Sequence, residues 1–181
     1  MSLKQILIKN EYTYKIYLYY NLFIRHKGFL KRKQYSQWGE DIYINNYFEN
    51  LKAGTYLDIG CFHPFMYSNT CLLFNKGWSG VNIDINQTSI DLFNIVRPKD
   101  TNICTTVSEE KKVFKVFFDD FFSPVNTLDE NFFKSLNKSF FKKKQVFTIK
   151  SKTISEILNT GKGKDKIDFL NIDAEGLDFK I

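Results

Sequence analysis

Few cysteines, glycines and prolines occur in this sequence: there are three, nine and three, respectively, among 181 residues. This scarcity excludes collagen-like proteins and disulfide-framework proteins. The cysteines, Cys61, Cys71 and Cys104, are odd in number and form no CxxC pair, so a zinc site is not indicated either. Free thiols are typical of a reducing compartment, and we therefore expect a cytoplasmic protein.

A long apolar run is also missing. No segment approaches the roughly 20 apolar residues that a membrane-spanning helix needs. Lys4, Lys9, Glu11 and Lys15 interrupt the N-terminal residues, so we expect no signal peptide there. Aromatic residues, in contrast, make up 17% of the chain, which argues against a fully disordered protein. The length and composition predict one globular domain with its own core.

Basic residues outnumber acidic ones by 26 to 20, which gives a formal net charge of +6. Such an excess occurs in proteins that bind nucleic acids or anionic membranes. The lysines are scattered along the chain rather than gathered in a stripe, so a general lysine-rich composition explains the charge equally well. We therefore expect no nucleic-acid partner.

The first 33 residues differ from the rest of the chain. They are rich in Tyr and Ile and end in a basic cluster, from which we predict a helical segment, residues 1–33, separate from a domain formed by residues 34–181. An aromatic helix with basic residues at its end is typical of a weak membrane-surface contact, here through residues 12–33. The alternative is a helix that packs on the domain or on a second subunit.

From residue 55 onward, short apolar runs alternate with segments of helical pattern. Alternation of this kind predicts an α/β fold, in which a parallel sheet has helices on both faces. A capping box at Thr153–Glu156 predicts a short helix, and Ser68 or Asn69 could cap an earlier one. We expect strands near residues 55–60, 80–85, 101–107, 113–118, 146–149 and 166–173, and a helix over 88–96.

Two of these strands end in residues suited to a nucleoside. The first ends at Asp58-Ile59-Gly60, and the second ends at Asp84. A glycine after the first strand lets the backbone approach a ligand, and an acidic residue about 20 positions on can accept both ribose hydroxyls. The glycine triple of dinucleotide sites is missing. A cofactor with a ribose and no pyrophosphate therefore fits better, which favours S-adenosylmethionine over NAD.

Five segments of the chain form an ordered set of motifs: Ser36–Asp41, Tyr56–Pro64, Ser68–Thr70, Gly77–Asp84 and Ile167–Gly176. Taken in this order, they resemble FkbM-type S-adenosylmethionine-dependent methyltransferases. The resemblance covers about four fifths of the chain, from Tyr35 to Asp178. It implies a Rossmann-like class I methyltransferase fold, a three-layer sandwich, and methyl transfer to a hydroxyl of a sugar, a glycan or a secondary metabolite.

The related methyltransferases have a seven-stranded sheet, whereas this sequence ends just after the segment that matches the fourth strand. The resemblance therefore implies that the C-terminal strands are missing and that the domain is truncated. An exposed strand edge would then need cover, and we expect that a partner could supply it.

The resemblance also implies a set of cofactor-binding residues. Ser68 and Asn69 would meet the cofactor's carboxylate, although helix capping explains them equally well. Glu40 would close over the cofactor. The alternative is that it is an acidic residue of the kind that stabilises the first turn of a helix. Ser108 is included only by its position next to the adenine. The full set is Asp58, Gly60, Ser68, Asn69, Asp84, Ser108 and Glu40.

Methyl transfer to a hydroxyl needs a group that takes up the hydroxyl proton. Asp173 is our first candidate for this general base, and Glu175 lies two residues further on. His63 is the second candidate, with a loop histidine bonded to the backbone as the alternative. Two carboxylates without a nearby histidine are a weak metal signal, so we predict no metal site.

Two other functions stay open from the sequence. A truncated half-sheet with an aromatic N-terminal segment could be a non-catalytic interaction module or a remnant. An RNA methyltransferase would agree with the positive charge, but the Asn-Pro-Pro-aromatic motif typical of base amino-group methylation is absent.

Overall fold

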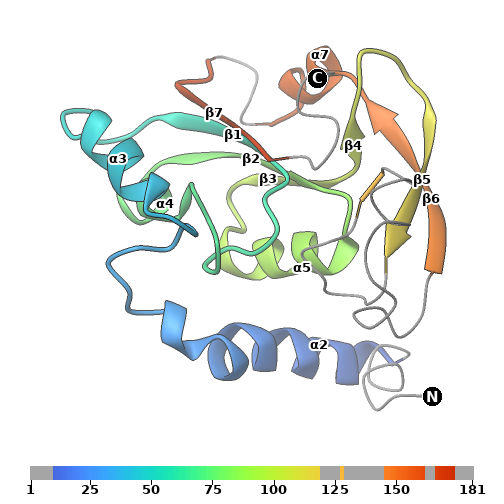
Figure 1. The fold of residues 1–181 in the computed structure, drawn as a ribbon, viewed down its shortest axis with the longest axis horizontal. Coiled ribbons are helices and arrows are strands. Elements are labelled where there is room, and N and C mark those ends of the chain that lie inside the picture. The colour runs from blue at the N-terminus through green and yellow to red at the C-terminus, as the bar shows by residue number, and fades with distance from the viewer. Residues whose placement is uncertain (1–9, 119–126, 129–144, 162–165, 174–181) are drawn as a thin grey trace.

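A computed structural model describes residues 10–118, 127–128, 145–161 and 166–173. These residues form two sheets with helices packed around them (Figure 1). The larger sheet has four parallel strands in the order β3-β2-β1-β7. Its strands are β1 (Thr55–Ile59), β2 (Ser79–Asp84), β3 (Thr101–Cys104) and β7 (Phe169–Ile172). The predicted α/β class with a parallel sheet is confirmed.

The two faces of this central sheet differ in chemistry because successive strand residues point to opposite sides. One face carries aliphatic side chains, including Leu57, Ile59, Val81 and Ile83, which form the main core. The opposite face carries Tyr56, Gly80 and polar residues. The sequence therefore places an apolar layer on one side of the sheet and a polar layer on the other.

Helices cover both faces, which is the predicted three-layer arrangement (Figure 1). Ile157 of α7 (Ile154–Leu158) packs into the aliphatic core. On the other side lie α4 (Cys71–Asn75) and α5 (Gln87–Val96), which link β1 to β2 and β2 to β3. Leu73 of α4 packs with Tyr56 and Trp78, beside α3 (Glu40–Tyr47).

The predicted third strand is divided between two sheets. Residues 101–104 pair with β2, whereas β4 (Thr106–Val107) pairs with β6 (Gln145–Lys152). Thr105 lies at the crossing, where its N–H donates to the Asp84 carbonyl and its hydroxyl donates to the Lys150 carbonyl. Strand β6 also pairs in antiparallel fashion with β5 (Val113–Phe118), which completes a three-stranded sheet.

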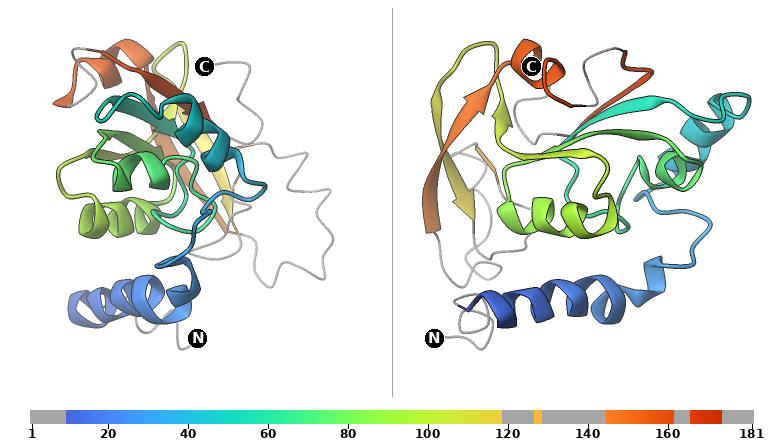
Figure 2. Two further views of the ribbon diagram at one scale, coloured as in Figure 1. Left: turned by 90° about the vertical axis from the view of Figure 1, so that its left-hand side faces the viewer. Right: turned by 180° about the vertical axis from the view of Figure 1, so that it is seen from behind.

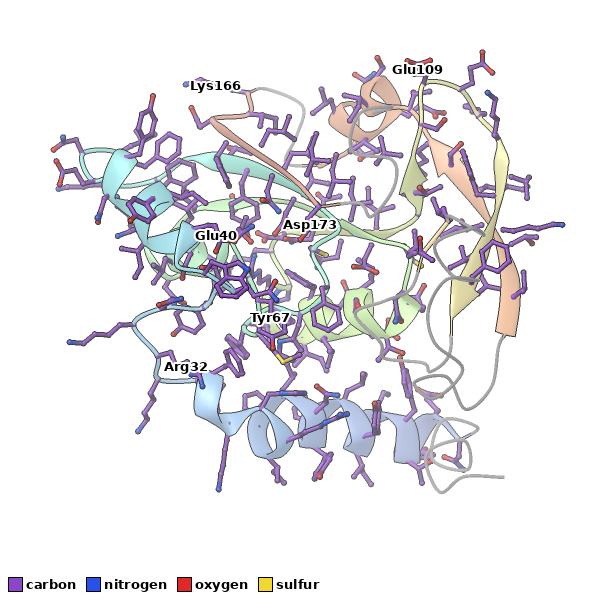
Figure 3. The ribbon with its side chains drawn as sticks, in the orientation of Figure 1. Arg32, Glu40, Tyr67, Glu109, Lys166 and Asp173 are labelled. Carbon is purple, nitrogen blue, oxygen red and sulfur yellow. The ribbon has the colours of Figure 1, made fainter. Side chains whose placement is uncertain are left out.

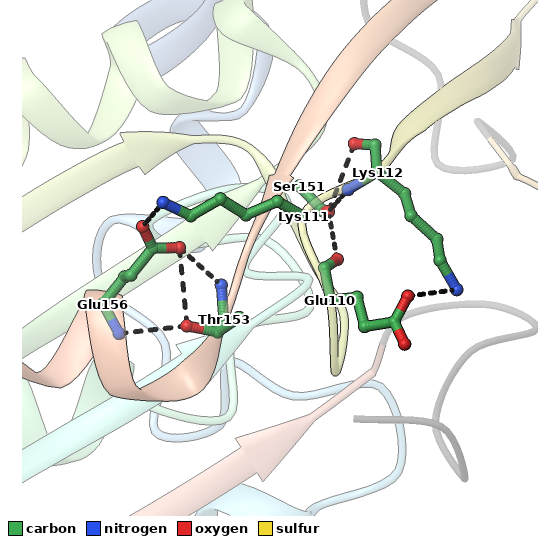
Figure 4. A network of polar contacts seen from close by, with 6 residues as sticks. All are labelled: Glu110, Lys111, Lys112, Ser151, Thr153 and Glu156. Atoms are coloured by element: carbon green, nitrogen blue, oxygen red, sulfur yellow. Dashed lines mark hydrogen bonds and ion pairs between the residues drawn. The ribbon is translucent and has the colours of Figure 1, made fainter.

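Polar contacts join this second sheet to α7 (Figure 4). Thr153 and Glu156 form the predicted capping box, and the Glu156 carboxylate also pairs with Lys111 at 2.5 Å. Ser151 Oγ accepts from Lys112 N at 2.8 Å and donates to the Glu110 carbonyl at 2.9 Å. The turn that precedes β5 is thereby tied to both β6 and α7.

The N-terminal segment packs against the domain along one side (Figure 2). It comprises α2 (Glu11–Tyr20), a π-helical turn η1 (Asn21–Arg25) and a 3₁₀ turn η2 (Lys27–Phe29). Its buried side chains Tyr17, Leu18 and Leu22 pack with Leu92 of α5. This is the packing alternative given above, whereas the domain boundary at residues 33/34 stays a prediction.

None of the helices among the described residues is long and apolar enough to cross a bilayer. In the described part of the chain, β7 pairs only with β1 and so lies at one edge of the central sheet. The missing C-terminal strands and a partner at this edge stay predictions, because residues 174–181 lie outside the described residues.

Candidate cofactor site

The two carboxylates chosen from the sequence lie on one face of the central sheet. Asp58 pairs in register with Asn82, and Asp84 lies two residues further along β2. Side chains two residues apart on a strand point to the same side, so both carboxylates face the polar layer at the carboxyl ends of neighbouring strands. Both are buried, with 1% and 9% of their surface exposed. Asp58 and Asp84 therefore share one face of the sheet, and their cofactor roles stay predictions.

Asp84 joins the loop after β1 to the turn after β2. Its Oδ2 accepts from Phe62 N at 2.8 Å, and its Oδ1 accepts from Asn86 N at 2.7 Å. Burial raises the pKa of this carboxyl to about 6, although the two N–H bonds act in the opposite direction. A carboxylate has about four lone-pair sites, so Asp84 keeps the capacity to accept a further hydrogen bond.

The loop that follows β1, directly after Asp58 and Ile59, has a backbone that requires glycine at residue 60. Gly60 has a φ of 81°, in the left-handed region, and Phe62 has a φ of 50°. The N–H groups of Gly60 and Cys61 both donate to the Ile83 carbonyl, at 2.8 and 3.1 Å. The loop is thereby fixed against the end of β2, where the backbone could approach a ligand closely.

Asp58 is held by neutral donors from two elements. Its Oδ2 accepts from Thr70 Oγ1 at 2.6 Å, and its Oδ1 accepts from Asn171 Nδ2 at 2.9 Å. Asn69 Nδ2 in turn donates to Asn171 Oδ1 at 3.0 Å. Burial raises the pKa of Asp58, and the bonds from Thr70 and Asn171 oppose this rise. The structure thus connects Asn69 to Asp58 through a residue that the sequence analysis did not select.

The prediction that Ser68 or Asn69 caps a helix is wrong. Helix α4 begins at Cys71, its N-cap is Thr70, and no side chain makes a capping hydrogen bond there. Ser68 is instead buried and accepts from Arg97 Nη2 at 3.2 Å. Ser68 and Asn69 both make hydrogen bonds in the polar layer of the sheet. Local sequence patterns do not reveal contacts of this kind.

Arg97 is the residue of this region that sequence reasoning missed. It follows α5 and is completely buried. Its Nη1 donates to Thr70 Oγ1 at 2.9 Å and its Nη2 donates to the Pro64 carbonyl at 3.0 Å. The guanidinium therefore fixes the loop after β1 and places a positive charge beside Asp58, whose pKa it lowers against the larger effect of burial. In the sequence, polar residues alternate with apolar ones along β1 and β2, and this alternation indicates a polar layer that a buried charge could enter.

Comparison with known proteins identifies the domain that contains these residues. The profile of the Methyltransferase FkbM domain matches residues 54–181, which is more than half of the chain. The chain belongs to the FkbM methyltransferase family. No curated protein and no solved structure matches it. The family assignment from the sequence is confirmed; the matched range includes Asp58, Asp84 and Arg97 and leaves out the segment 36–41.

His63 lies inside this FkbM domain, and its surroundings favour a loop-anchoring role. Its Nδ1 accepts from the backbone N–H groups of Phe65 and Met66, at 3.0 and 2.9 Å. The ring is completely buried and lies 5.2 Å from the His26 ring. Burial, reinforced by His26, lowers the pKa of His63 to about 3. The alternative of a loop histidine bonded to the backbone therefore fits better than a general base.

We expect His63 to make the FkbM domain sensitive to acid. Because its pKa falls from 6.5 in the unfolded chain to about 3 in the folded one, only the unfolded chain takes up its proton between these values. Stability is therefore lost as the pH falls, by about 2 kcal/mol from about pH 7 to about pH 5. In His63→Asn, Oδ1 can still accept both N–H bonds. Denaturant unfolding across this pH range should show that the variant lacks this loss.

The other histidine is the control for this experiment. Burial lowers the pKa of His26 as well, but its side chain is only partly buried. His26→Asn should therefore change the pH dependence less than His63→Asn does. An identical acid sensitivity of the parent and His63→Asn would show that His63 is not the buried neutral group.

Two of the remaining predicted residues, Asp173 and Glu40, are labelled in Figure 3. Asp173 follows β7, donates its N–H to the Ile59 carbonyl at 2.8 Å and has an exposed side chain. Asn171 pairs in register with Asp58, and Asp173 lies two residues further along the chain. Burial is the main cause of the raised pKa of Asp58, and the Asp173 charge adds to it. Glu175 lies outside the described residues. No group of three or more histidine, cysteine or carboxylate side chains suited to a metal ion occurs in the part that the structure describes.

Glu40 and Ser108 make hydrogen bonds outside the group formed by Asp58 and Asp84. Glu40 is exposed at the start of α3, where its Oε2 accepts from Trp38 N at 2.9 Å. The Ser108 N–H donates to the Lys152 carbonyl, which places Ser108 beside β6 of the second sheet. These contacts do not join either residue to the Asp58 and Asp84 group, and their cofactor roles stay predictions.

Proposed function

We propose that this protein is an S-adenosylmethionine-dependent methyltransferase that methylates a hydroxyl group. The observation that carries the proposal is the pair of buried carboxylates, Asp58 and Asp84, at the ends of neighbouring parallel strands on either side of Gly60. This edge of an open parallel sheet is where nucleoside ligands bind. Membership of the FkbM methyltransferase family supports the reaction class.

The residues present fit an adenosyl group. Asp84 is a buried carboxylate whose described hydrogen bonds come only from backbone N–H groups, and its remaining lone pairs suit the two ribose hydroxyls. Asp58, with Thr70 and Asn171, would lie toward the amino-acid end of the cofactor. The cofactor, when bound, supplies the methyl group as an electrophile. The protein aligns that group with the acceptor oxygen.

Asp173 is our proposed general base. It lies at the end of β7, next to Asp58, and its side chain is exposed, so an acceptor hydroxyl could reach it. Glu175 stays a second candidate on the sequence alone.

A sugar or glycan acceptor has support from a pocket beside the loop after β1. The pocket has a volume of about 300 Å³ and lies between the N-terminal segment and this loop, where Figure 3 labels Arg32 and Tyr67. Aromatic rings and amide groups suit the apolar face and the hydroxyls of a sugar, and basic side chains suit an acidic substituent. Its lining residues are Phe29, Arg32, Lys33, Gln34, Ser36, Gln37 and Tyr67.

Calorimetry with S-adenosylhomocysteine tests the cofactor proposal. The parent protein should bind it, and Asp84→Asn should bind at least about 10-fold more weakly, because hydrogen bonds to a charged group contribute about 1.5–3 kcal/mol. Asp91→Asn is the matched control. Asp91 bonds to Tyr14 and Gln87, away from the strand ends, and its variant should bind normally.

The calorimetry distinguishes a cofactor-binding methyltransferase from a non-catalytic interaction module. A folded parent protein that gives no binding heat would end the cofactor proposal and favour a non-catalytic interaction module. Equal affinities of the parent and Asp84→Asn would remove Asp84 from the ribose site. Circular dichroism of each sample establishes that it is folded.

A further inference from the structure

The outward side of the N-terminal helical segment has a continuous row of exposed apolar side chains. Their spacing of three and four residues places them on one side of the helix. Each has between 44% and 79% of its surface exposed. The members of this apolar row are Tyr12, Ile16, Tyr19, Tyr20, Phe23 and Ile24.

The apolar row is distinct from the side that packs on the domain. Tyr17, Leu18 and Leu22 are buried against α5, so the helix already has its partner on that side. Figure 2 shows α2 along the outside of the molecule, with the rest of the fold on one side of it only. An exposed apolar strip of this length marks a contact surface rather than scattered surface residues.

The charges next to the apolar row have one sign. Residues 12–39 contain no acidic residue, and Glu11 is paired with Lys15 at 2.9 Å. Five basic residues at the end of the row are exposed. They are Arg25, Lys27, Lys31, Arg32 and Lys33.

These charges distinguish between the two obvious occupants of the surface. A second copy of this chain that contacts the row through the same segment would bring no acidic residue from its own residues 12–39 to pair with the basic cluster. Anionic lipid headgroups complement the cluster, and Tyr, Phe and Ile side chains suit the boundary between headgroups and acyl chains.

We propose that residues 12–33 bind the surface of an anionic membrane, with α2 lying in the plane of that surface. The apolar row enters the headgroup region, and the basic cluster contacts the lipid phosphates. The helix stays attached to the domain through its opposite side, so the contact holds the whole domain at the bilayer without spanning it. The inference does not depend on the proposed methyltransferase reaction, although Arg32 and Lys33 of the basic cluster also line the pocket proposed for the acceptor.

Sedimentation with vesicles tests this surface. The whole protein should sediment with phosphatidylcholine vesicles that contain about one third phosphatidylglycerol, and only weakly with phosphatidylcholine alone. The double variant Ile16→Glu/Ile24→Glu should reduce the partition coefficient at least about 10-fold, because it puts two anions into the apolar row. Added salt should also weaken the binding, since the attraction is partly electrostatic.

Tyr43→Glu/Tyr47→Glu is the matched control. These tyrosines of α3 are 79% and 83% exposed and lie outside the row. The control should sediment like the parent, and thermal unfolding should show that both double variants stay folded. Equal sedimentation of the two double variants, or no sedimentation of the parent with anionic vesicles, would overturn the proposal. A dimer that only the Ile16→Glu/Ile24→Glu variant loses, without vesicle binding, would assign the surface to a second copy.

Discussion

Replacing Arg97 with methionine should lower the free energy of unfolding by about 4 kcal/mol, because removing one partner of a buried charged network leaves the others uncompensated. Asp58 would lose its positive neighbour, and Thr70, Pro64 and Ser68 would each lose a hydrogen-bond donor. Methionine has a similar length and packs well among apolar side chains, so the loss reports the charge and the hydrogen bonds more than the volume. Denaturant unfolding measures the change.

Arg25→Met is the matched control for this prediction. Arg25 ends η1 and is exposed, so the same substitution there should change the free energy of unfolding by less than about 0.5 kcal/mol. Similar losses at the two positions would contradict the central role that the structure gives Arg97. A small loss at Arg97 would show that Asp58 does not need a buried positive charge.

Gly80→Ala should lower the free energy of unfolding by about 3 kcal/mol or prevent folding, since an added methyl group has no space there. A Cβ at Gly80 would lie 2.5 Å from Tyr56 Cδ2 and closer still to the Tyr56 carbonyl oxygen. Strands β1 and β2 would have to separate, and both carry carboxylates of the proposed cofactor site. Thermal or denaturant unfolding of the purified variant, or its loss from the soluble fraction, measures the effect.

Gly28→Ala tests whether this loss comes from the contact with Tyr56. Nothing lies within 4 Å of a Cβ at Gly28, which sits in the 3₁₀ turn η2. Alanine there should leave stability unchanged or raise it by a few tenths of a kcal/mol, because it restricts the unfolded chain. If Gly80→Ala were as well tolerated as Gly28→Ala, the close approach of β1 and β2 at this position would be wrong.

Elements with local causes could be predicted from the sequence. The helix expected over residues 88–96 and the capping box of Thr153 and Glu156 depend on residues that are near in sequence, and both are present. The apolar runs of β1 and β2 are buried on a parallel sheet, as their composition indicates. It could be predicted that Asp58 and Asp84 lie at one edge of the sheet, because parallel strands bring their carboxyl ends to one edge.

Elements with distant partners could not be predicted. The segment 101–107 has one uninterrupted strand pattern, yet the pairing partners β2 and β6 divide it between two sheets. His63 resembled a possible base until the structure showed its Nδ1 bonded to two backbone N–H groups and its ring buried beside His26. Partners of this kind are set by the packing of segments that the chain brings together only on folding.

Periodicity, caps and short motifs act over a few residues, so the family, the α/β class and the two carboxylates at the strand ends could be predicted from the chain alone. The position of Arg97 beside Asp58, and the packing of one side of α2 on α5 with its apolar row outward, depend on the folded arrangement. A charge or an apolar side chain has a different energy in water and in the protein interior. Which of the two environments it occupies is set by distant segments.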